Sequence, residues 1–139
     1  MSAHPLSKIT IGIPAYNEAA NIKHLLLALL KQNTTGFILH EIIVISDGST
    51  DDTVKIARSI TNSRIHVFEF TQREGQQKRQ NQILAQYTGD IIVFIEADTL
   101  PASVDTLKHL VEPLLILHSD DKLMMTIGNP YYLTPRNFF

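Results

Sequence analysis

Two carboxylates, Glu96 and Asp98, follow an apolar run with a single residue between them. In an extended segment, side chains two positions apart point the same way, so both carboxylates can face one site. Side by side and uncompensated, they would repel each other and raise each other's pKa. A divalent cation removes this conflict, and oxygen ligands suit Mg²⁺ or Mn²⁺. The pair therefore predicts a metal site whose ion can bridge a protein carboxylate and substrate phosphates.

Helix capping is the simpler interpretation of the same residues. Asp98 or Thr99 could cap a helix that has Pro101 in its first turn. Capping accounts for one polar residue, however, and leaves Glu96 without a role. The metal site is therefore the favoured interpretation.

Two other polar segments contain residue types that suit nucleotide binding. In the segment 47–52, Gly48 permits a tight turn and a hydroxyl can cap the next helix, but neither role requires Asp47. At the end of a strand, that carboxylate can accept a hydrogen bond from a base N–H or a ribose hydroxyl. In the segment 14–18, Asn17 can cap a helix, and Tyr16 offers an aromatic face on which a base can stack. Packing in the core is an equal alternative for Tyr16.

The elements that position these segments alternate along the chain. Apolar, β-branched runs predict strands over residues 9–13, 42–45, 65–70 and 91–95, with a weaker candidate over 123–127. The second and fourth runs are apolar throughout, as expected of strands buried on both faces. The third contains His66 and Glu69, which favour an edge position.

Helical patterns fill the intervals between the strands. They cover residues 18–32, 51–59, 76–87 and a segment from 101 to 118, and Ser49-x-x-Asp52 is typical of a capping box. Alternating strands and helices predict an open, Rossmann-like, mostly parallel α/β sheet with helices on both faces. Ligands bind beyond the carboxyl ends of the strands in such sheets. All of the polar segments above follow predicted strands, so they should meet at one edge.

Residues 11–18, 41–52 and 89–101 resemble, in order and spacing, the nucleotide-binding half of family 2 glycosyltransferases. The resemblance implies the GT-A fold and inverting transfer of a sugar from a nucleotide diphosphate sugar to an acceptor hydroxyl. It also implies a divalent metal, Mg²⁺ or Mn²⁺, as cofactor. A UDP- or GDP-sugar would be the partner, and the acceptor, a saccharide or a lipid, is left open.

The resemblance further implies roles for individual residues. Tyr16 would lie against the base and Asp47 at its edge, while Asp98 would be the closer metal ligand and Glu96 the more distant one. The full set of implied nucleotide-binding residues is Pro14, Ala15, Tyr16, Glu18, Asp47, Gly48 and Asn81. Two positions depart from the family pattern. The metal motif usually begins with Asp, where this chain has Glu96. A basic residue commonly follows the glycine of the segment 75–81, where this chain has Gln76. A solvated face is the simpler interpretation of Arg73, Lys78 and Arg79.

The composition excludes several classes of protein. The 139 residues suffice for one domain, and a net charge of -2 argues against a nucleic-acid partner. The absence of cysteine excludes disulfides and thiolate metal sites. The N-terminus lacks a signal-peptide pattern, and no apolar run is long enough to span a bilayer. We expect a cytoplasmic domain that reaches the cytoplasmic face of a membrane only through a C-terminal region beyond this sequence.

No residue stands out as a catalytic base. In family 2 enzymes the base follows the metal motif, in the acceptor-binding half, and Glu112, Asp120 and Asp121 have no setting that marks one. We therefore expect residues 1–139 to form a single nucleotide-sugar-binding domain that lacks the acceptor-binding half and is inactive alone. One alternative is a sugar-phosphate nucleotidyltransferase, which would have a glycine-rich phosphate loop with a basic residue after the first strand. The other is a non-catalytic nucleotide-binding or interaction module on the same fold.

Overall fold

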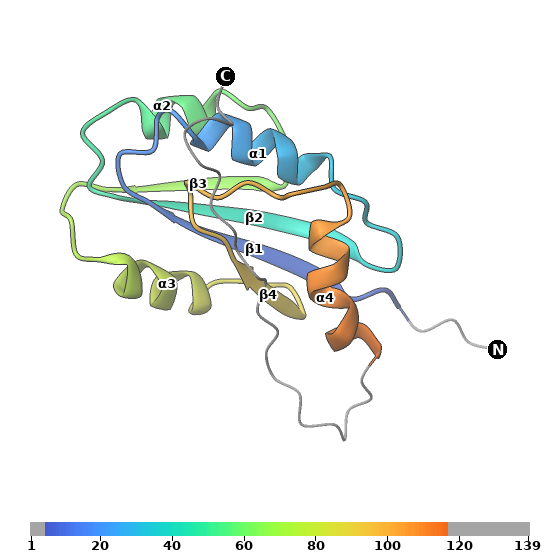
Figure 1. Cartoon of the computed structure of the whole chain (residues 1–139). Coiled ribbons are helices and arrows are strands. Elements are labelled where there is room, and N and C mark those ends of the chain that lie inside the picture. Colours follow the sequence, from blue (N-terminus) through green and yellow to red (C-terminus); the bar gives the residue numbers. More distant parts are fainter. Residues whose placement is uncertain (1–4, 117–139) are drawn as a thin grey trace.

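The computed structural model describes residues 5–116 of the chain. The weak strand candidate over 123–127, Asp120 and Asp121 lie outside the described residues. Strands and helices alternate throughout (Figure 1). Their order is β1 (Lys8–Ala15), α1 (Ile22–Leu30), β2 (Ile38–Asp47), α2 (Thr53–Arg58), β3 (Ile65–Phe70), α3 (Gln76–Leu84), β4 (Ile91–Phe94) and α4 (Thr106–Ile116).

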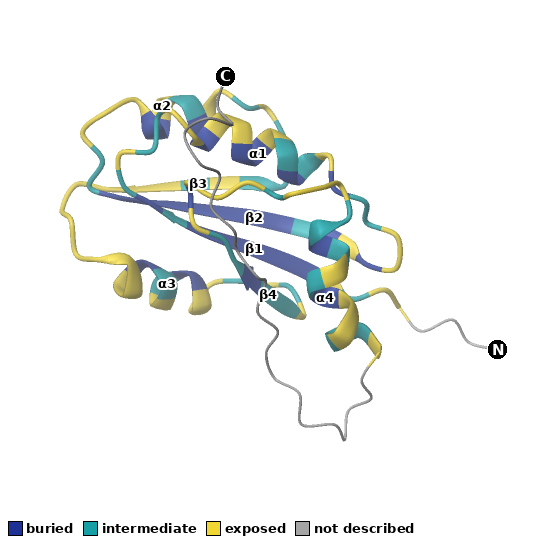
Figure 2. Ribbon diagram, in the orientation of Figure 1, coloured by how far each residue is buried: buried dark blue, intermediate teal, exposed yellow. Residues whose placement is uncertain are grey.

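The four strands form one parallel sheet in the order β3-β2-β1-β4. The predicted parallel α/β architecture is therefore confirmed. The edge position predicted for the third strand is confirmed as well, and β3 is largely exposed (Figure 2). Within residues 5–116, no helix is long and apolar enough to cross a membrane.

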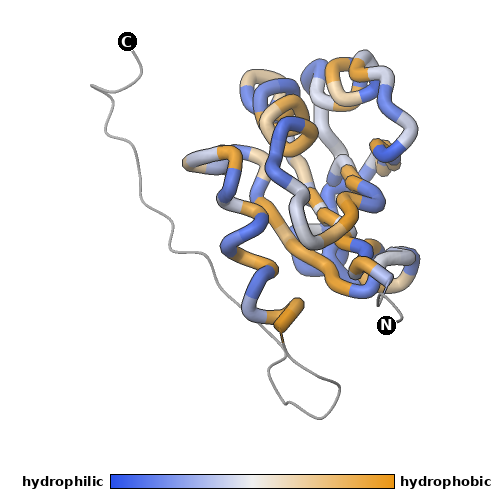
Figure 3. The backbone as a smooth tube through the Cα atoms, turned by 90° about the vertical axis from the view of Figure 1, so that its right-hand side faces the viewer, coloured by the Kyte–Doolittle hydropathy of each residue, from blue (hydrophilic) through white to orange (hydrophobic). Residues whose placement is uncertain are grey.

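Two hydrophobic clusters lie on opposite faces of the sheet. The larger one contains Ile42 and Val44 of β2, packed under α1, α2 and the first turns of α4. The smaller one contains Ile43 and Ile45 of β2, which face Ile83 of α3. This alternation is the period of two that a strand imposes on its side chains. Figures 1 and 3 show α1 and α2 on one side of the apolar strands and α3 on the other.

Burial on both faces is confirmed for β2 but is wrong for β4. In β4, Val93 is buried and its neighbours in the strand are half-buried. The reason is its position at the edge of the described sheet, where β4 pairs with β1 on one side only. An apolar run shows that a strand is able to be buried on both faces. How far it is buried depends on the elements that pack against it.

Both predicted helix caps on this side of the molecule are wrong. Helix α1 begins at Ile22 with Asn21 as its N-cap residue, whereas Asn17 has a left-handed backbone, φ +50°, in the loop that follows β1. Helix α2 begins at Thr53, and its first amide donates to Oδ1 of Asp51 at 3.0 Å. Ser49 is instead bonded to the neighbouring loop, as described below.

Candidate functional site

The carboxyl ends of the parallel strands bring the predicted site segments to one edge of the sheet. Ala15 at the end of β1 pairs with Ser46 of β2, so Tyr16 and Asp47 follow on adjacent strands. On the other side of β1, the amide of Ile95 donates to the carbonyl of Gly12 at 3.0 Å. The acidic segment after β4 therefore leaves the sheet beside β1, on the side opposite to β2.

Asn17 fastens the loop after β1 to the loop after β2. Its Oδ1 accepts a hydrogen bond from the amide of Thr50 at 2.7 Å, and its own amide donates to Oγ of Ser49 at 3.1 Å. One residue later, the amide of Glu18 donates to Oγ1 of Thr53 at 2.8 Å. Asparagine tolerates the left-handed conformation that this geometry requires. Hydrogen bonds thus join the two loops, and Tyr16 directly precedes Asn17, which makes the first of these bonds.

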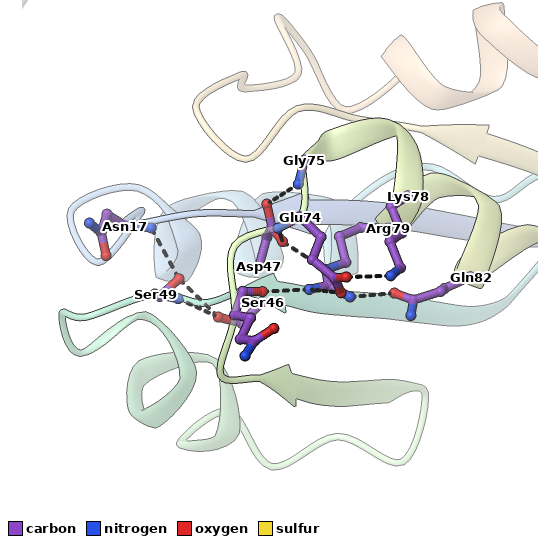
Figure 4. A network of polar contacts seen from close by, with 10 residues as sticks. Asn17, Ser46, Asp47, Ser49, Glu74, Gly75, Lys78, Arg79 and Gln82 are labelled. Carbon is purple, nitrogen blue, oxygen red and sulfur yellow. Dashed lines mark hydrogen bonds and ion pairs between the residues drawn. The ribbon is translucent and has the colours of Figure 1, made fainter.

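Asp47 lies at the centre of a second polar network (Figure 4). Its side chain is 5% exposed. Oδ1 accepts from the amide of Glu74 and from Nε of Arg79, both at 2.8 Å, and Oδ2 accepts from the amide of Gly75 at 2.9 Å. Burial opposes ionisation of this carboxyl, but the amide bonds and the Arg79 guanidinium outweigh it and lower its pKa. Asp47 is therefore a buried, charged anchor for the loop between β3 and α3.

Arg79 is fully buried, so its assignment to a solvated face is wrong. Its Nη2 donates to the carbonyl of Gln72 at 2.7 Å, its Nη1 donates to Oε1 of Gln82 at 2.9 Å, and its guanidinium lies 4.2 Å from the centroid of Phe70. A buried carboxylate such as Asp47 needs a partner of this kind. The burial of Asp47 was the signal that could have predicted a cationic partner. No local sequence pattern shows this partner, because it lies 32 residues away.

Gly48 and Arg73 bring the loop after β3 close to Tyr16. Gly48 has φ +72°, and a Cβ added there would lie 2.7 Å from the backbone nitrogen of Arg73. The guanidinium of Arg73 lies 3.8 Å from the centroid of the half-buried Tyr16 ring. Arg73 is exposed, as its assignment to a solvated face predicts, and it also lies over the predicted base-stacking residue, a contact that the sequence interpretation missed.

The acidic pair lies in a tight turn, not in an extended segment. The strand ends at Phe94, and the amide of Thr99 donates to the carbonyl of Glu96 at 3.0 Å. Both carboxylates are nevertheless exposed, while Ala97 between them is buried. Capping by Asp98 or Thr99 is excluded because α4 begins only at Thr106.

Neither acidic side chain has a hydrogen-bond or ion-pair partner among residues 5–116, where no cluster of three or more metal-ligating side chains occurs. The donor set is therefore two free carboxylates on one turn. Mg²⁺ is commonly bound in this way, through one or two carboxylates with waters and substrate phosphates completing the shell.

The remaining predicted site residues differ in how close they come to this edge. Pro14 and Ala15 form the end of β1, and Glu18 accepts a hydrogen bond from Nδ2 of Asn21 at 2.7 Å, within the loop that follows. Asn81 is exposed in the middle of α3, and its side chain makes no hydrogen bond to another described residue. The structure joins the loops after β1, β2 and β3 directly; Asn81 and the acidic turn share no bond with them.

A Rossmann-like sheet with polar loops gathered at its carboxyl edge is a nucleotide-binding architecture. The sequence model described as "Glycosyl transferase family 2" matches residues 10–123. The chain belongs to this glycosyltransferase family, and the fold is that of the GT-A type.

Known proteins similar to this chain agree with that assignment. The O-antigen chain rhamnosyltransferase RfbN of Salmonella typhimurium is 30% identical over 135 residues, which is 94% of this chain and 42% of the relative. A mannosyltransferase from Pyrobaculum calidifontis, solved with GDP-Man and Mn²⁺, matches with a TM-score of 0.68 and 29% identity over 78% of this chain and 32% of its own. Glucosyl-3-phosphoglycerate synthase from Mycobacterium tuberculosis, solved with Mn²⁺, UDP and phosphoglyceric acid, matches with a TM-score of 0.65 and 32% identity over 79% of this chain and 39% of its own. The chain thus spans less than half the length of each of these relatives.

Proposed function

We propose that this chain is the donor-binding domain of an inverting glycosyltransferase and binds a UDP- or GDP-sugar through a divalent metal ion. The observation that carries the proposal is the pair Glu96 and Asp98, which follows the carboxyl end of a strand, is exposed and has no partner among residues 5–116. Asp47 and Glu41, by contrast, are buried and hydrogen-bonded to other parts of the chain. Two free carboxylates on one turn are suited to an ion.

The metal would be held by Asp98, with Glu96 contributing directly or through water, and Mg²⁺ and Mn²⁺ both suit oxygen ligands. When bound, the ion would neutralise the charge that develops on the departing diphosphate. Two similar structures, the mannosyltransferase and the synthase, contain Mn²⁺ with a nucleotide, which supports this assignment.

The nucleoside would lie against the loops that Asn17 fastens together. Tyr16 offers its ring to the base, and the bonded loops keep the ring in place before the ligand arrives, so little ordering is needed on binding. The residues proposed to line this site are Pro14, Ala15, Tyr16, Glu18, Asp47, Gly48 and Asn81.

Transfer itself needs an acceptor site and a base. Glu112, one of the acidic residues considered for this role, is exposed on α4. The similar glycosyltransferases are more than twice as long as this chain, which supports an acceptor-binding half beyond it. The expectation that residues 1–139 bind the donor but do not transfer it, and the predicted cytoplasmic location, belong to the same proposal.

Nucleotide binding with and without metal tests the proposal. UDP and GDP are titrated into the chain by calorimetry, once with Mn²⁺ and once with EDTA. We expect one nucleotide to bind more tightly with Mn²⁺ and Asp98→Ala to remove the difference. Tyr16→Ala should weaken binding about tenfold, the typical size of a lost base–aromatic stack.

The matched control is Glu112→Ala, which removes an exposed carboxylate from α4 and should leave binding unchanged. Equal affinity in Mn²⁺ and EDTA would rule out the metal-dependent site. The absence of binding to either nucleotide would favour the alternative of an interaction module on this fold.

A further inference from the structure

Strand β3 has a row of backbone groups that point away from the sheet. The carbonyl of Arg64, directly before the strand, accepts a hydrogen bond from the amide of Ile42 in β2 at 2.8 Å. Successive residues of a strand direct their backbone groups to opposite sides, so the even-numbered residues of β3 face β2. The N–H and C=O groups of Val67 and Glu69 therefore face outward, where no other strand of the described residues pairs with them.

The sequence of β3 lacks the usual protections of an exposed edge, which are lysine, proline, a bulge or a very short strand. The strand has six residues without lysine or proline, and its register with β2 is continuous from Ile65 to Phe70. Its one acidic side chain, Glu69, is paired with Arg58 at 3.3 Å. Phe68 and Phe70 are 40% and 36% exposed on the face of the sheet that carries α3. This edge is suited to pairing with a further strand.

A second copy of the chain complements the edge of β3 by symmetry. Two β3 strands related by a two-fold axis perpendicular to the sheet run antiparallel, and the axis can pass beside Phe68. Val67 of each copy is then opposite Glu69 of the other, so that each outward N–H meets an outward C=O. The two Phe68 rings are opposite each other, and His66 is opposite Phe70. One register thus pairs the free donors with the free acceptors and joins the exposed rings.

Helix α2 supports the same pairing on the other face of the sheet. It lies over β2 and β3 (Figure 1). Strands are about 4.8 Å apart, so the α2 helices of the two copies would lie about 10 Å apart, a normal distance for packed helices. The groove between α2 and the edge of β3 is lined by charges of both signs, from Asp51, Lys55, Arg58 and Glu69. Because the two helices would be antiparallel, Asp51 before one helix would face Lys55 and Arg58 of the other.

We propose that the chain forms a symmetric dimer through β3, in which two four-stranded sheets join into one sheet with Phe68 at the two-fold axis. This inference does not depend on the proposed nucleotide-binding function. The antiparallel junction turns the carboxyl edges of the two sheets in opposite directions, so both candidate sites stay open. One strand pair and one helix pair make a small interface, and we expect a dissociation constant of about 10–100 µM.

Sedimentation equilibrium of the wild-type chain and two variants at one position tests the strand pairing. Glu69→Pro removes an N–H that faces away from β2, so the sheet loses no hydrogen bond, whereas the junction loses one donor from each copy. We expect the dissociation constant of the dimer to rise at least about tenfold. Glu69→Thr is the matched control, because it removes the same carboxylate but keeps the N–H, and it should dimerise like the wild-type chain. A wild-type chain that stays monomeric at concentrations above the expected range would overturn the proposal, as would equal dimerisation of the two variants.

A cysteine cross-link tests the register and does not require Glu69→Pro to fold. The chain has no cysteine, so Phe68→Cys provides one thiol in each copy. Across the axis the two Cα atoms would be about 4.5 Å apart, a distance that a disulfide can span. His66→Cys is the matched control, since residue 66 is exposed on the same face of β3 but would lie about 14 Å from its counterpart.

Both cysteine variants are oxidised with glutathione disulfide near the dissociation constant and separated on a non-reducing gel. Phe68→Cys should form a covalent dimer, and His66→Cys should remain monomeric. Equal cross-linking of the two variants would overturn the proposed junction, because chance collisions or another register would then explain it. Cross-linking of neither variant would overturn the pairing of β3 with its copy.

Discussion

Strand β2 has a buried carboxylate near each end, and the two are satisfied in different ways. At the carboxyl end, Asp47 is paired with the cation Arg79 and with two loop amides. Near the amino end, Glu41 has no cationic hydrogen-bond partner in the part of the chain that the structure describes. Its Oε1 accepts three bonds, at 2.7 to 3.0 Å, from the hydroxyl of Thr10 and from the amide and hydroxyl of Thr88.

The two sites connect different parts of the fold. Glu41 joins β2 to β1 and to the turn that precedes β4, and Gly89 in that turn donates to Oγ1 of Thr10 at 3.1 Å. These contacts join two neighbouring strands and the turn that leads into β4. Asp47 joins β2 to a loop and to the start of α3, which line the proposed ligand edge. Glu41, near the amino end of β2, thus stabilises contacts within the sheet. Asp47, at the carboxyl end, holds the loops of the proposed nucleotide site against the sheet.

The difference teaches that the carboxylate paired with a cation is the one that holds the loop between β3 and α3, whereas Glu41 joins β2 to β1 and to the turn before β4 with neutral donors alone. A strand is already fixed by its ladder of backbone bonds, and a loop has no such ladder. Burial disfavours both charges, and in both the bonds to the carboxylate outweigh it, so that the pKa of each carboxyl is lowered. Substitutions at the two ends should therefore differ in size and in consequence.

The largest expected effect is the loss of the cation at the carboxyl end. Arg79→Ala leaves the buried Asp47 without its partner, and breaking a buried pair in this way typically lowers the free energy of unfolding by about 3–5 kcal/mol. Urea-induced unfolding measures the change. Arg58→Ala is the control, since its ion pair with Glu69 has both side chains about half exposed and should contribute less than about 1 kcal/mol. Similar losses in the two variants would show that the buried pair is not the anchor.

Two glycines with left-handed backbone give the next comparison. Gly36, just before β2, has φ +96° and open space around it, whereas Gly48, just after β2, has φ +72° and the Arg73 backbone against it. Alanine at either position should lower the free energy of unfolding by about 1–2 kcal/mol for the backbone alone. Gly48→Ala should exceed Gly36→Ala because the loop must also move. Equal losses would mean that the loop yields freely to a Cβ.

The sequence predicted the sheet well because apolar runs are local signals. The bounds of β3 agree with its run at 65–70, and its edge position followed from His66 and Glu69. The start of α1 was wrong by four residues, since the left-handed turn at Asn17 depends on bonds to Thr50 and Ser49 in another loop. The fold could be derived from periodicity, but not the points where one loop is bonded to the next.

The same limit applied to the site. Polar residues at strand ends predicted that the loops after the strands meet at one edge of the sheet, and the structure places them there. The residues that link these loops were missed. Arg79 and Arg73 were assigned to a solvated face because they lie in a polar segment. Arg79 is buried against Asp47, so its assignment was wrong; Arg73 is exposed, as assigned, but its contact with Tyr16 was missed. Residues that interact across a long stretch of sequence have no characteristic spacing. Only the burial of Asp47 would have predicted that it needs a cationic partner.

Amide substitutions should distinguish the two carboxylates without changing their size. Asn in place of Asp47 turns one acceptor into an NH₂ donor that faces the donors of Gly75 or Arg79, and the loss of charged hydrogen bonds should lower the free energy of unfolding by about 1.5–3 kcal/mol. Gln in place of Glu41 can keep an oxygen toward Thr10 and Thr88, so its loss should be below about 1 kcal/mol. Urea-induced unfolding of both variants gives the comparison, and a larger loss for Glu41→Gln would reverse it.

The smallest expected effect is a difference in acid sensitivity between the same two variants. A carboxyl whose pKa is lower in the folded chain stabilises it above its unfolded pKa, and this stabilisation is lost as the pH falls through the folded value. The ordinary values are 4.5 for Glu41 and 3.8 for Asp47, and both are lowered on folding. As the pH falls from 6 to 3, the wild-type chain should lose stability, with the contribution of Glu41 beginning to fall near 4.5 and that of Asp47 nearer 3.8.

Glu41→Gln should remove the earlier part of the loss and Asp47→Asn the later part, as measured by urea-induced unfolding at each pH. Asp51 and Glu74 also have lowered pKa values and remain in both variants, so neither curve becomes flat. If both variants ran parallel to the wild-type chain, the two buried carboxyls would titrate alike in the folded and unfolded states, and their bonds would not favour the charged form.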